Sequence, residues 1–211
     1  VDSICRIRDK GCSRIVRAAF DYAKMNNRKK VTLVHKANIL KQAGAALLNA
    51  GKAIAPEYPG IVMEDRIIDN MCMQLVTRPE NYDVIVTTNL FGDILSDLAA
   101  GLVGGLGVAG GANVGSDAAI FEAVHGSAPD IAGKGLANPT AILKSSVMML
   151  YHMGERALAR RLDTAINDTL RIKEHCTADL GGKAGTREFT GYIIRSLEKN
   201  AIELETGAFN T

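Results

Sequence analysis

The sequence predicts an α/β fold whose strands are largely parallel. An apolar run at residues 31–34 and a continuous β-branched run at 84–86 are typical of buried strands. Helical patterns separate these runs, and a helix between two strands is the usual connection in a parallel sheet. A glycine-rich stretch at 104–115 is the best candidate boundary between two lobes.

The first half of the chain alternates between helices and strands, each closed by turn residues. The helix expected at 12–25 ends at the polar turn Asn26-Asn27-Arg28, and a later helix stops before Pro79, as helices usually do. In chain order, the predicted elements are a helix at 12–25, a strand at 31–34, a helix at 39–55, a short strand at 61–63, a helix at 67–76, a strand at 84–86 and a helix at 91–102.

The second half is expected to be mostly helical. An extended run at 118–124 follows the glycine-rich stretch, and a loop at 125–139 leads into the helices. These helices are predicted at 140–153, 156–173 and 186–197, the last of them after Gly181 and Gly182.

Composition excludes several classes of protein. The 211 residues are 47% hydrophobic and 23% charged, as in ordinary globular proteins, and suffice for one large domain or two small ones. A net charge of +2 is too small for nucleic-acid binding, and we expect no membrane association, because no run approaches 18 apolar residues. The four cysteines form no C-x-x-C pair, which favours reduced structural thiols. No signal-peptide pattern opens the chain. Because the first residue is Val1 rather than Met and a helical pattern follows almost at once, we expect the chain to be cut from a longer one.

One glycine motif imitates a dinucleotide-binding fingerprint. The segment from Gly105 to Gly110 matches G-x-G-x-x-G, and Asp130 lies 20 residues beyond it. The true fingerprint follows a strand and opens a helix. Here the motif follows a predicted helix and leads into an extended run, so we interpret it as a flexible connection.

Three aspartates are candidate metal ligands. Asp93 and Asp97 are four residues apart on one predicted helix and therefore share a face, and Asp69 lies on an earlier helix. Carboxylates from separate elements suit Mg²⁺ or Mn²⁺. The alternatives are that Asp93 complements the macrodipole in the first turn of its helix and that Asp97 lies on a solvated face.

Two further segments carry candidate binding groups. Lys36 follows the strand at 31–34, at the end where open α/β sheets bind ligands, and could bind a carboxylate or transfer a proton. In the loop after residue 124, Gly126 would allow a ligand close to the backbone, and Asp130 could accept hydrogen bonds from a ribose diol while repelling a 2′-phosphate. A solvated lysine and an aspartate in a proline-containing turn are the alternatives.

The chain resembles the isocitrate and isopropylmalate dehydrogenase family from about residue 10 to 197. Four segments carry the resemblance: Val34-His35-Lys36-Ala37-Asn38-Ile39, residues 82–86, residues 89–97 (NLFGDILSD) and residues 121–134 (FEAVHGSAPDIAGK). The resemblance implies an isopropylmalate-dehydrogenase-like fold with two lobes and mixed sheets, distinct from a true Rossmann fold. Residues 1–104 would then belong to the small substrate-, metal- and dimer-forming domain, and 105–211 to the large NAD-binding domain.

The resemblance also implies roles for individual residues. Lys36 would be catalytic and Asn38 would bind substrate, while Asp69, Asp93 and Asp97 would hold Mg²⁺ or Mn²⁺. Asp130, followed by Ile131, would select NAD, since NADP-using members typically have a lysine and then a tyrosine there. The implied contacts to the adenosine half of NAD are His125, Gly126, Ser127, Ala128, Pro129, Asp130, Ile131 and Asn138.

Within the family, the stretch Phe121-Glu122-Ala123-Val124-His125-Gly126 is similar to the NAD-dependent isocitrate branch. The implied reaction is the NAD-dependent oxidative decarboxylation of isocitrate to 2-oxoglutarate, in the mitochondrial matrix of a eukaryote or the cytoplasm of a bacterium. The alternatives are 3-isopropylmalate as substrate and a non-catalytic regulatory subunit; Lys36 and the three aspartates count against the latter.

The resemblance implies active sites shared between subunits of a homodimer or hetero-oligomer. The family's substrate-binding serine, arginine cluster and catalytic tyrosine would lie upstream of Val1, so we expect the 211 residues alone to be inactive. The segment Gln42-Ala43-Gly44-Ala45-Ala46 departs from the family pattern, and the sequence assigns no consequence to it.

Overall fold

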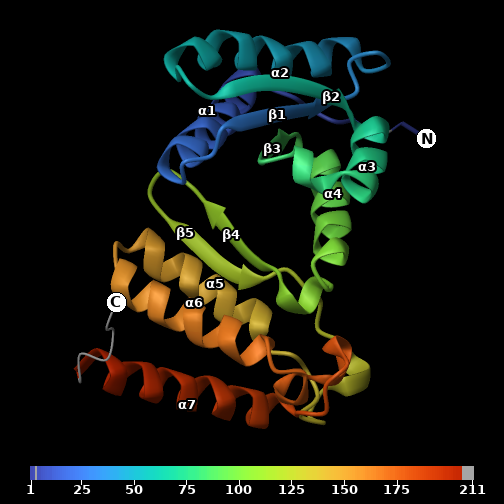
Figure 1. Ribbon diagram of the computed structural model, residues 1–211. Helices are drawn as coiled ribbons and strands as arrows, with labels where there is room; N and C mark the ends of the chain where they lie inside the picture. Colours follow the sequence, from blue (N-terminus) through green and yellow to red (C-terminus); the bar gives the residue numbers. More distant parts are fainter. Residues whose placement is uncertain (3, 206–211) are drawn as a thin grey trace. The chain divides into compact units, whose positions relative to one another are not determined.

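The computed structural model describes residues 1–2 and 4–205 and divides the chain into two compact units, Val1–Ala99 and Ala100–Thr211. The first unit is a parallel sheet covered by helices on both faces (Figure 1). Strand β1 (Lys30–His35) lies between β2 (Val62–Ile67) and β3 (Val84–Thr87). Both pairings are parallel, and Val31 faces Met63 on one side and Val84 on the other.

The alternation of side chains along β1 explains why this sheet needs helices on both faces. Leu33 packs with residues of α1 (Asp9–Met25) and α2 (Lys41–Ile54), including Phe20 and Leu47. Its neighbour Val34 points the other way and packs with residues of α3 (Ile68–Thr77) and α4 (Asn89–Leu102), including Met71 and Leu95. Both faces of β1 are therefore apolar, as its uninterrupted hydrophobic run predicts.

The second unit is an antiparallel strand pair with three helices. Strands β4 (Gly110–Val114) and β5 (Ala119–Ala123) pack against α5 (Thr140–His152). Helix α6 (Arg156–Leu170) lies between α5 and α7 (Thr186–Glu205), as Figure 1 shows. The apolar centre of these helices includes Val147, Ile166, Phe189 and Ile193.

The predicted α/β fold with mixed sheets is confirmed, with one parallel and one antiparallel sheet. Two elements differ from expectation. The short strand predicted at 61–63 extends to Ile67, and the glycine-rich stretch, interpreted as a flexible connection, contains the strand β4. The G-x-G-x-x-G match follows α4 and reaches β4 through a 3-10 turn at Leu106–Val108, so it lacks the strand-to-helix context of a fingerprint.

No helix in the described part of the chain is both long and apolar enough to cross a bilayer. The prediction that the lobe boundary lies near residue 104 falls within a few residues of the division between the two units. The substrate-domain and NAD-domain roles given to them stay predictions.

Candidate active site

Lys36 stands in a tight turn at the carboxyl end of β1. The Lys36 carbonyl accepts hydrogen bonds from the backbone N–H groups of Ile39, at 3.0 Å, and Leu40, at 2.8 Å. The Ala37 N–H donates to Nδ1 of His35 at 3.0 Å, and Asn38 is exposed within the turn. The turn is therefore closed by several hydrogen bonds, and it lies at the strand end where open α/β sheets bind ligands.

Asp69 meets Lys36 from the neighbouring strand. It lies in the first turn of α3, directly after β2, which is paired with β1. The Lys36 ammonium donates a hydrogen bond to Oδ1 of Asp69, and this bond, together with Asp69's own backbone N–H, lowers the pKa of the carboxyl group below its ordinary value. Asp69 is thus held ionised beside a cation at the carboxyl edge of the sheet.

Asp93 and Asp97 are both exposed on α4. The helix begins at Asn89, so Asp93 is beyond the first turn, and the interpretation of Asp93 as a partner of the helix macrodipole is wrong. Among the residues whose side chains the structure describes, no three His, Cys, Asp or Glu are grouped so that they could hold a metal ion. The chain on its own does not bring Asp69 together with the α4 pair, and their common metal site stays a prediction.

An apolar cavity of about 160 Å³ adjoins the Lys36 turn. Its lining includes His35, Lys36, Leu40, Leu47 and Phe91. The stem of Lys36 therefore borders apolar surface while its ammonium group meets Asp69, and the side chain is 26% exposed.

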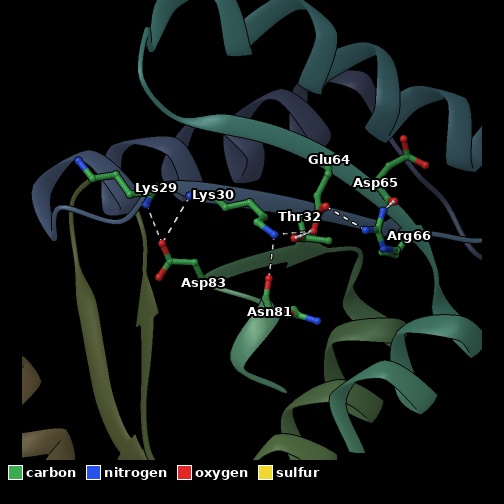
Figure 2. Close-up of polar contacts among 8 residues, drawn as sticks. All are labelled: Lys29, Lys30, Thr32, Glu64, Asp65, Arg66, Asn81 and Asp83. Atoms are coloured by element: carbon green, nitrogen blue, oxygen red, sulfur yellow. Dashed lines mark hydrogen bonds and ion pairs between the residues drawn. The ribbon is translucent and has the colours of Figure 1, made fainter. Parts of the chain in front are cut away.

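Figure 2 shows the polar contacts along the strands below this turn. Glu64 on β2 accepts hydrogen bonds from Thr32, at 2.9 Å, and from Arg66, at 2.9 Å. Asp83, just before β3, accepts the backbone N–H of Lys29 at 2.6 Å. The bond from Thr32 to Glu64 ties β2 to β1, and the bond from Lys29 to Asp83 ties the start of β1 to the start of β3. These contacts support the pairing that brings the carboxyl ends of β1 and β2, next to Lys36 and Asp69, side by side.

The loop predicted to bind adenosine, residues 125–131, is exposed in the second unit. Ala128 has the left-handed conformation (φ 43°, ψ 63°), which is uncommon for a residue other than glycine, and it precedes a 3-10 turn at Pro129–Ile131 that contains Asp130. A side chain added at Gly126 would meet nothing within 4 Å, so this backbone is open to approach. Sparsely populated backbone conformations are concentrated at ligand-binding sites.

Asn138 ends the same loop and is buried. Its Oδ1 accepts the backbone N–H of Thr140 at 2.9 Å, and its Nδ2 donates to Asp179 at 3.0 Å. Asn138 therefore fixes the start of α5 to the segment that carries Asp179.

Four residues at these places carried no assigned role in the sequence analysis: His35, Gly44, Asp65 and Asp179. His35 lies inside a motif that carries the family resemblance, which is the one signal that could have drawn attention to it. The others are brought to these places only by the fold. Asp65 is hydrogen-bonded to His35, Gly44 lies against Ala37, and Asp179 is hydrogen-bonded to Asn138.

Comparison with known proteins shows which family the chain belongs to. The model of the isocitrate/isopropylmalate dehydrogenase family matches residues 1–193. The chain belongs to this family of oxidoreductases. The dehydrogenase family membership agrees with the position of Lys36 and Asp69 at the carboxyl edge of a parallel sheet.

Three similar proteins define the chain's place among these dehydrogenases. The mitochondrial NAD isocitrate dehydrogenase subunit 2 of Schizosaccharomyces pombe is 49% identical over 94% of this chain and 53% of its own length. A mitochondrial regulatory subunit of the NAD isocitrate dehydrogenase of Dictyostelium discoideum is 52% identical over 95% of this chain and 56% of its own length. The crystal structure of isocitrate dehydrogenase from Methylococcus capsulatus superimposes with a TM-score of 0.90 at 54% identity, covering 93% of this chain and 58% of that one.

The chain thus spans a little over half the length of these dehydrogenases. The family comprises enzymes for two related acids, and its relatives include a subunit named as regulatory. Family membership therefore leaves the substrate and the catalytic competence of the whole protein to be tested.

Proposed function

We propose that this chain serves the NAD-dependent oxidative decarboxylation of isocitrate to 2-oxoglutarate. The observation that carries the proposal is the contact between Lys36 and Asp69, which places a cation and an ionised carboxylate at the ligand-binding edge of a parallel sheet. The names of the similar NAD isocitrate dehydrogenase subunits favour isocitrate over 3-isopropylmalate.

Each candidate residue has a task in this reaction. When bound, NAD would accept the hydride from carbon 2, and a divalent cation would polarise the hydroxyl and carboxylate of the acid. Asp69, Asp93 and Asp97 would supply the hard oxygen ligands that Mg²⁺ or Mn²⁺ prefers. Lys36 would move a proton at its Nζ atom, and Asn38 in the same turn would contact the substrate.

The second unit would bind the dinucleotide. The exposed loop from His125 to Ile131 and the end of that loop at Asn138 would contact the adenosine half. Asp130 would accept hydrogen bonds from the ribose diol, and its charge would repel the 2′-phosphate of NADP. We expect a preference for NAD for this reason.

The similar proteins also support a proposal for the oligomeric state and the cellular location, since they are named as subunits of mitochondrial enzymes. We infer that the protein works as a homodimer or hetero-oligomer with shared active sites. We also infer that it acts in the mitochondrial matrix if its source is eukaryotic and in the cytoplasm if it is bacterial. The proposal needs no nucleic acid and no membrane.

The test is an initial-rate assay of the intact protein containing this chain. Isocitrate and 3-isopropylmalate are compared, each with NAD or NADP and with Mg²⁺ present or chelated. We expect turnover with isocitrate, NAD and Mg²⁺, and its loss in a Lys36→Ala variant. Faster turnover of 3-isopropylmalate would assign the other substrate. Turnover that requires a second subunit type and survives Lys36→Ala in this chain would assign a regulatory function, which one of the similar proteins carries in its name.

A further inference from the structure

We propose that His35 is a positioning residue that holds the Lys36 turn through a neutral imidazole ring. This inference deepens the proposed function and rests on the function given there to Lys36. His35 is the last residue of β1, directly precedes Lys36 and is only 6% exposed. A buried imidazole needs partners for both of its nitrogens, and those partners determine what it can do.

The two ring nitrogens of His35 have different partners. Nδ1 accepts the backbone N–H of Ala37 at 3.0 Å, so Nδ1 carries no proton. The ring proton is therefore on Nε2, which lies 3.0 Å from Oδ2 of Asp65 and donates to it. His35 is thus a neutral ring whose tautomer is fixed from both sides, and its contact with Asp65 is a hydrogen bond to a carboxylate.

Asp65 anchors the ring to the neighbouring strand. It belongs to β2 and is paired with Leu33, whereas His35 is paired with Ile67, two residues further along β2. Leu33 packs with the residues of α1 and α2, and His35, two positions further along the strand, faces the same side. The imidazole accordingly links β2 to the backbone just beyond the end of β1.

The peptide group that joins Lys36 to Ala37 is held at both of its polar atoms. The Ala37 N–H is held by His35, and the Lys36 carbonyl is held by the N–H groups of Ile39 and Leu40. The lysine side chain leaves this anchored backbone on its way to Asp69. A lysine side chain is long and flexible, so a fixed starting point limits where its ammonium group can reach.

Two substitutions separate the contacts of His35. In His35→Asn, the amide oxygen takes the place of Nδ1 and can accept an N–H two residues ahead, as in an Asx-turn, but the donor to Asp65 is lost. In His35→Gln, the longer amide can donate to Asp65, but the acceptor for Ala37 is lost. Each variant loses one hydrogen bond of a buried group, so each should lower the melting temperature by a similar amount.

The kinetics of the intact enzyme are expected to separate the two variants. A lysine that is misplaced only in the reacting geometry lowers kcat and kcat/KM together while KM stays constant. We expect His35→Asn to retain kcat within roughly threefold, and His35→Gln to lose roughly ten- to a hundredfold, because a shift of about 1 Å at a catalytic group can cost that much. The exposed His152 provides the matched control, His152→Asn, which should leave the kinetics unchanged.

A merely structural function of His35 predicts a different result. If His35 only stabilised the fold, His35→Asn and His35→Gln would have equal kcat values, because both lose a similar amount of stability. That result overturns the inference, as does a higher kcat in His35→Gln than in His35→Asn, because the Asp65 contact would then be the one that matters.

A second measurement tests the geometry without turnover. In the intact enzyme labelled with ¹⁵N-histidine, the ring signals of His35, assigned by their loss in His35→Asn, should show the neutral tautomer with its proton on Nε2. A proton on Nδ1 overturns the inference whatever the kinetics show. Full activity of Lys36→Ala would instead overturn the proposed function of Lys36, and the tautomer would still decide whether His35 holds the turn.

Discussion

At Gly44, helix α2 packs directly against the Lys36 turn. A Cβ atom at Gly44 would lie 2.6 Å from both Cα and Cβ of Ala37 and 2.9 Å from its backbone nitrogen. Such distances require the backbone of the turn to move. Gly44 lies within the segment where the sequence departs from the family pattern, and the structure shows what the glycine does there.

Gly44→Ala should therefore displace the Lys36 turn. We expect a loss of stability of about 1–3 kcal/mol, as is usual for overpacking, measured by denaturant unfolding. We also expect kcat with isocitrate to fall by roughly tenfold or more, because Ala37 adjoins Lys36, the proposed catalytic lysine. Gly11→Ala is the matched control: Gly11 is also helical, and an added Cβ there meets nothing within 4 Å. Equal behaviour of the two variants would contradict the steric explanation.

The buried Ser145 ties strands β4 and β5 to α5. Its Oγ accepts the backbone N–H of Gly111 at 3.1 Å and lies 2.7 Å from the carbonyl of Glu122, to which it donates. Gly110 also lies close to the backbone of α5, since a Cβ atom added at Gly110 would be 2.8 Å from the backbone nitrogen of Ser145. The strand pair is thus packed directly against the helix backbone.

Removing this hydroxyl should loosen the second unit. Ser145→Ala leaves the N–H of Gly111 without its acceptor, and we expect a cost of about 1–3 kcal/mol in the free energy of unfolding. The neighbouring Ser146→Ala is the control, because the Ser146 hydroxyl bonds only within its own helix, to the carbonyl of Ile142. It should change stability by no more than about 0.5 kcal/mol. A Ser145→Ala protein as stable as the control would show that β4 and β5 are held by apolar packing alone.

The glycines at 110 and 111 also show why some strands, such as β1 and β3, could be predicted from the sequence and β4 could not. The strands β1 and β3 are rich in β-branched residues, and this local preference agrees with their burial, so the residue pattern suffices to find them. Glycine has a low strand preference, and β4 begins with two. Their purpose is the close approach to α5, a contact between segments more than thirty residues apart that no local pattern records.

The candidate site shows the same limit. The position of Lys36 after a strand is visible in the sequence, because strand ends can be predicted from apolar runs. The partners of His35 and Gly44 are not visible, because they depend on the register of β1 with β2 and on the packing of α2. The sequence motif contains His35, and only the fold shows that both of its ring nitrogens are engaged.

At the scale of the whole molecule, the three aspartates proposed as metal ligands raise the question of a second subunit. Asp69 is 68% exposed and Asp93 and Asp97 are exposed, yet no described group of three such side chains could hold a metal within one chain. Core packing accounts for only some of the apolar residues on α3 and α4. Met73, Val76 and Ile94 are about half exposed, which favours the expectation that these helices contribute to a subunit interface.

A complementation experiment tests the shared site. Inactive Lys36→Ala and Asp93→Asn enzymes are mixed under conditions that exchange subunits. If one subunit supplies Lys36 and Asp69 and its neighbour supplies Asp93 and Asp97, a mixed dimer has one doubly damaged site and one intact site. We then expect activity to return to as much as half of the wild-type value per mixed dimer. If exchange is shown by mass spectrometry and no activity returns, each site lies within one chain.

The position of β1 has a consequence for hydrogen exchange and dynamics. Its backbone is hydrogen-bonded to strands on both sides, and residues 31–35 are buried. Amide groups in such a strand become accessible to solvent only in the rarest openings of a domain, which approach global unfolding. The turn that begins at Lys36 is attached to this slowest-opening part of its unit. Fraying at the outer edges of β2 and β3 is therefore expected to leave the lysine backbone in place, and we expect hydrogen exchange at residues 31–35 to be the slowest in this unit.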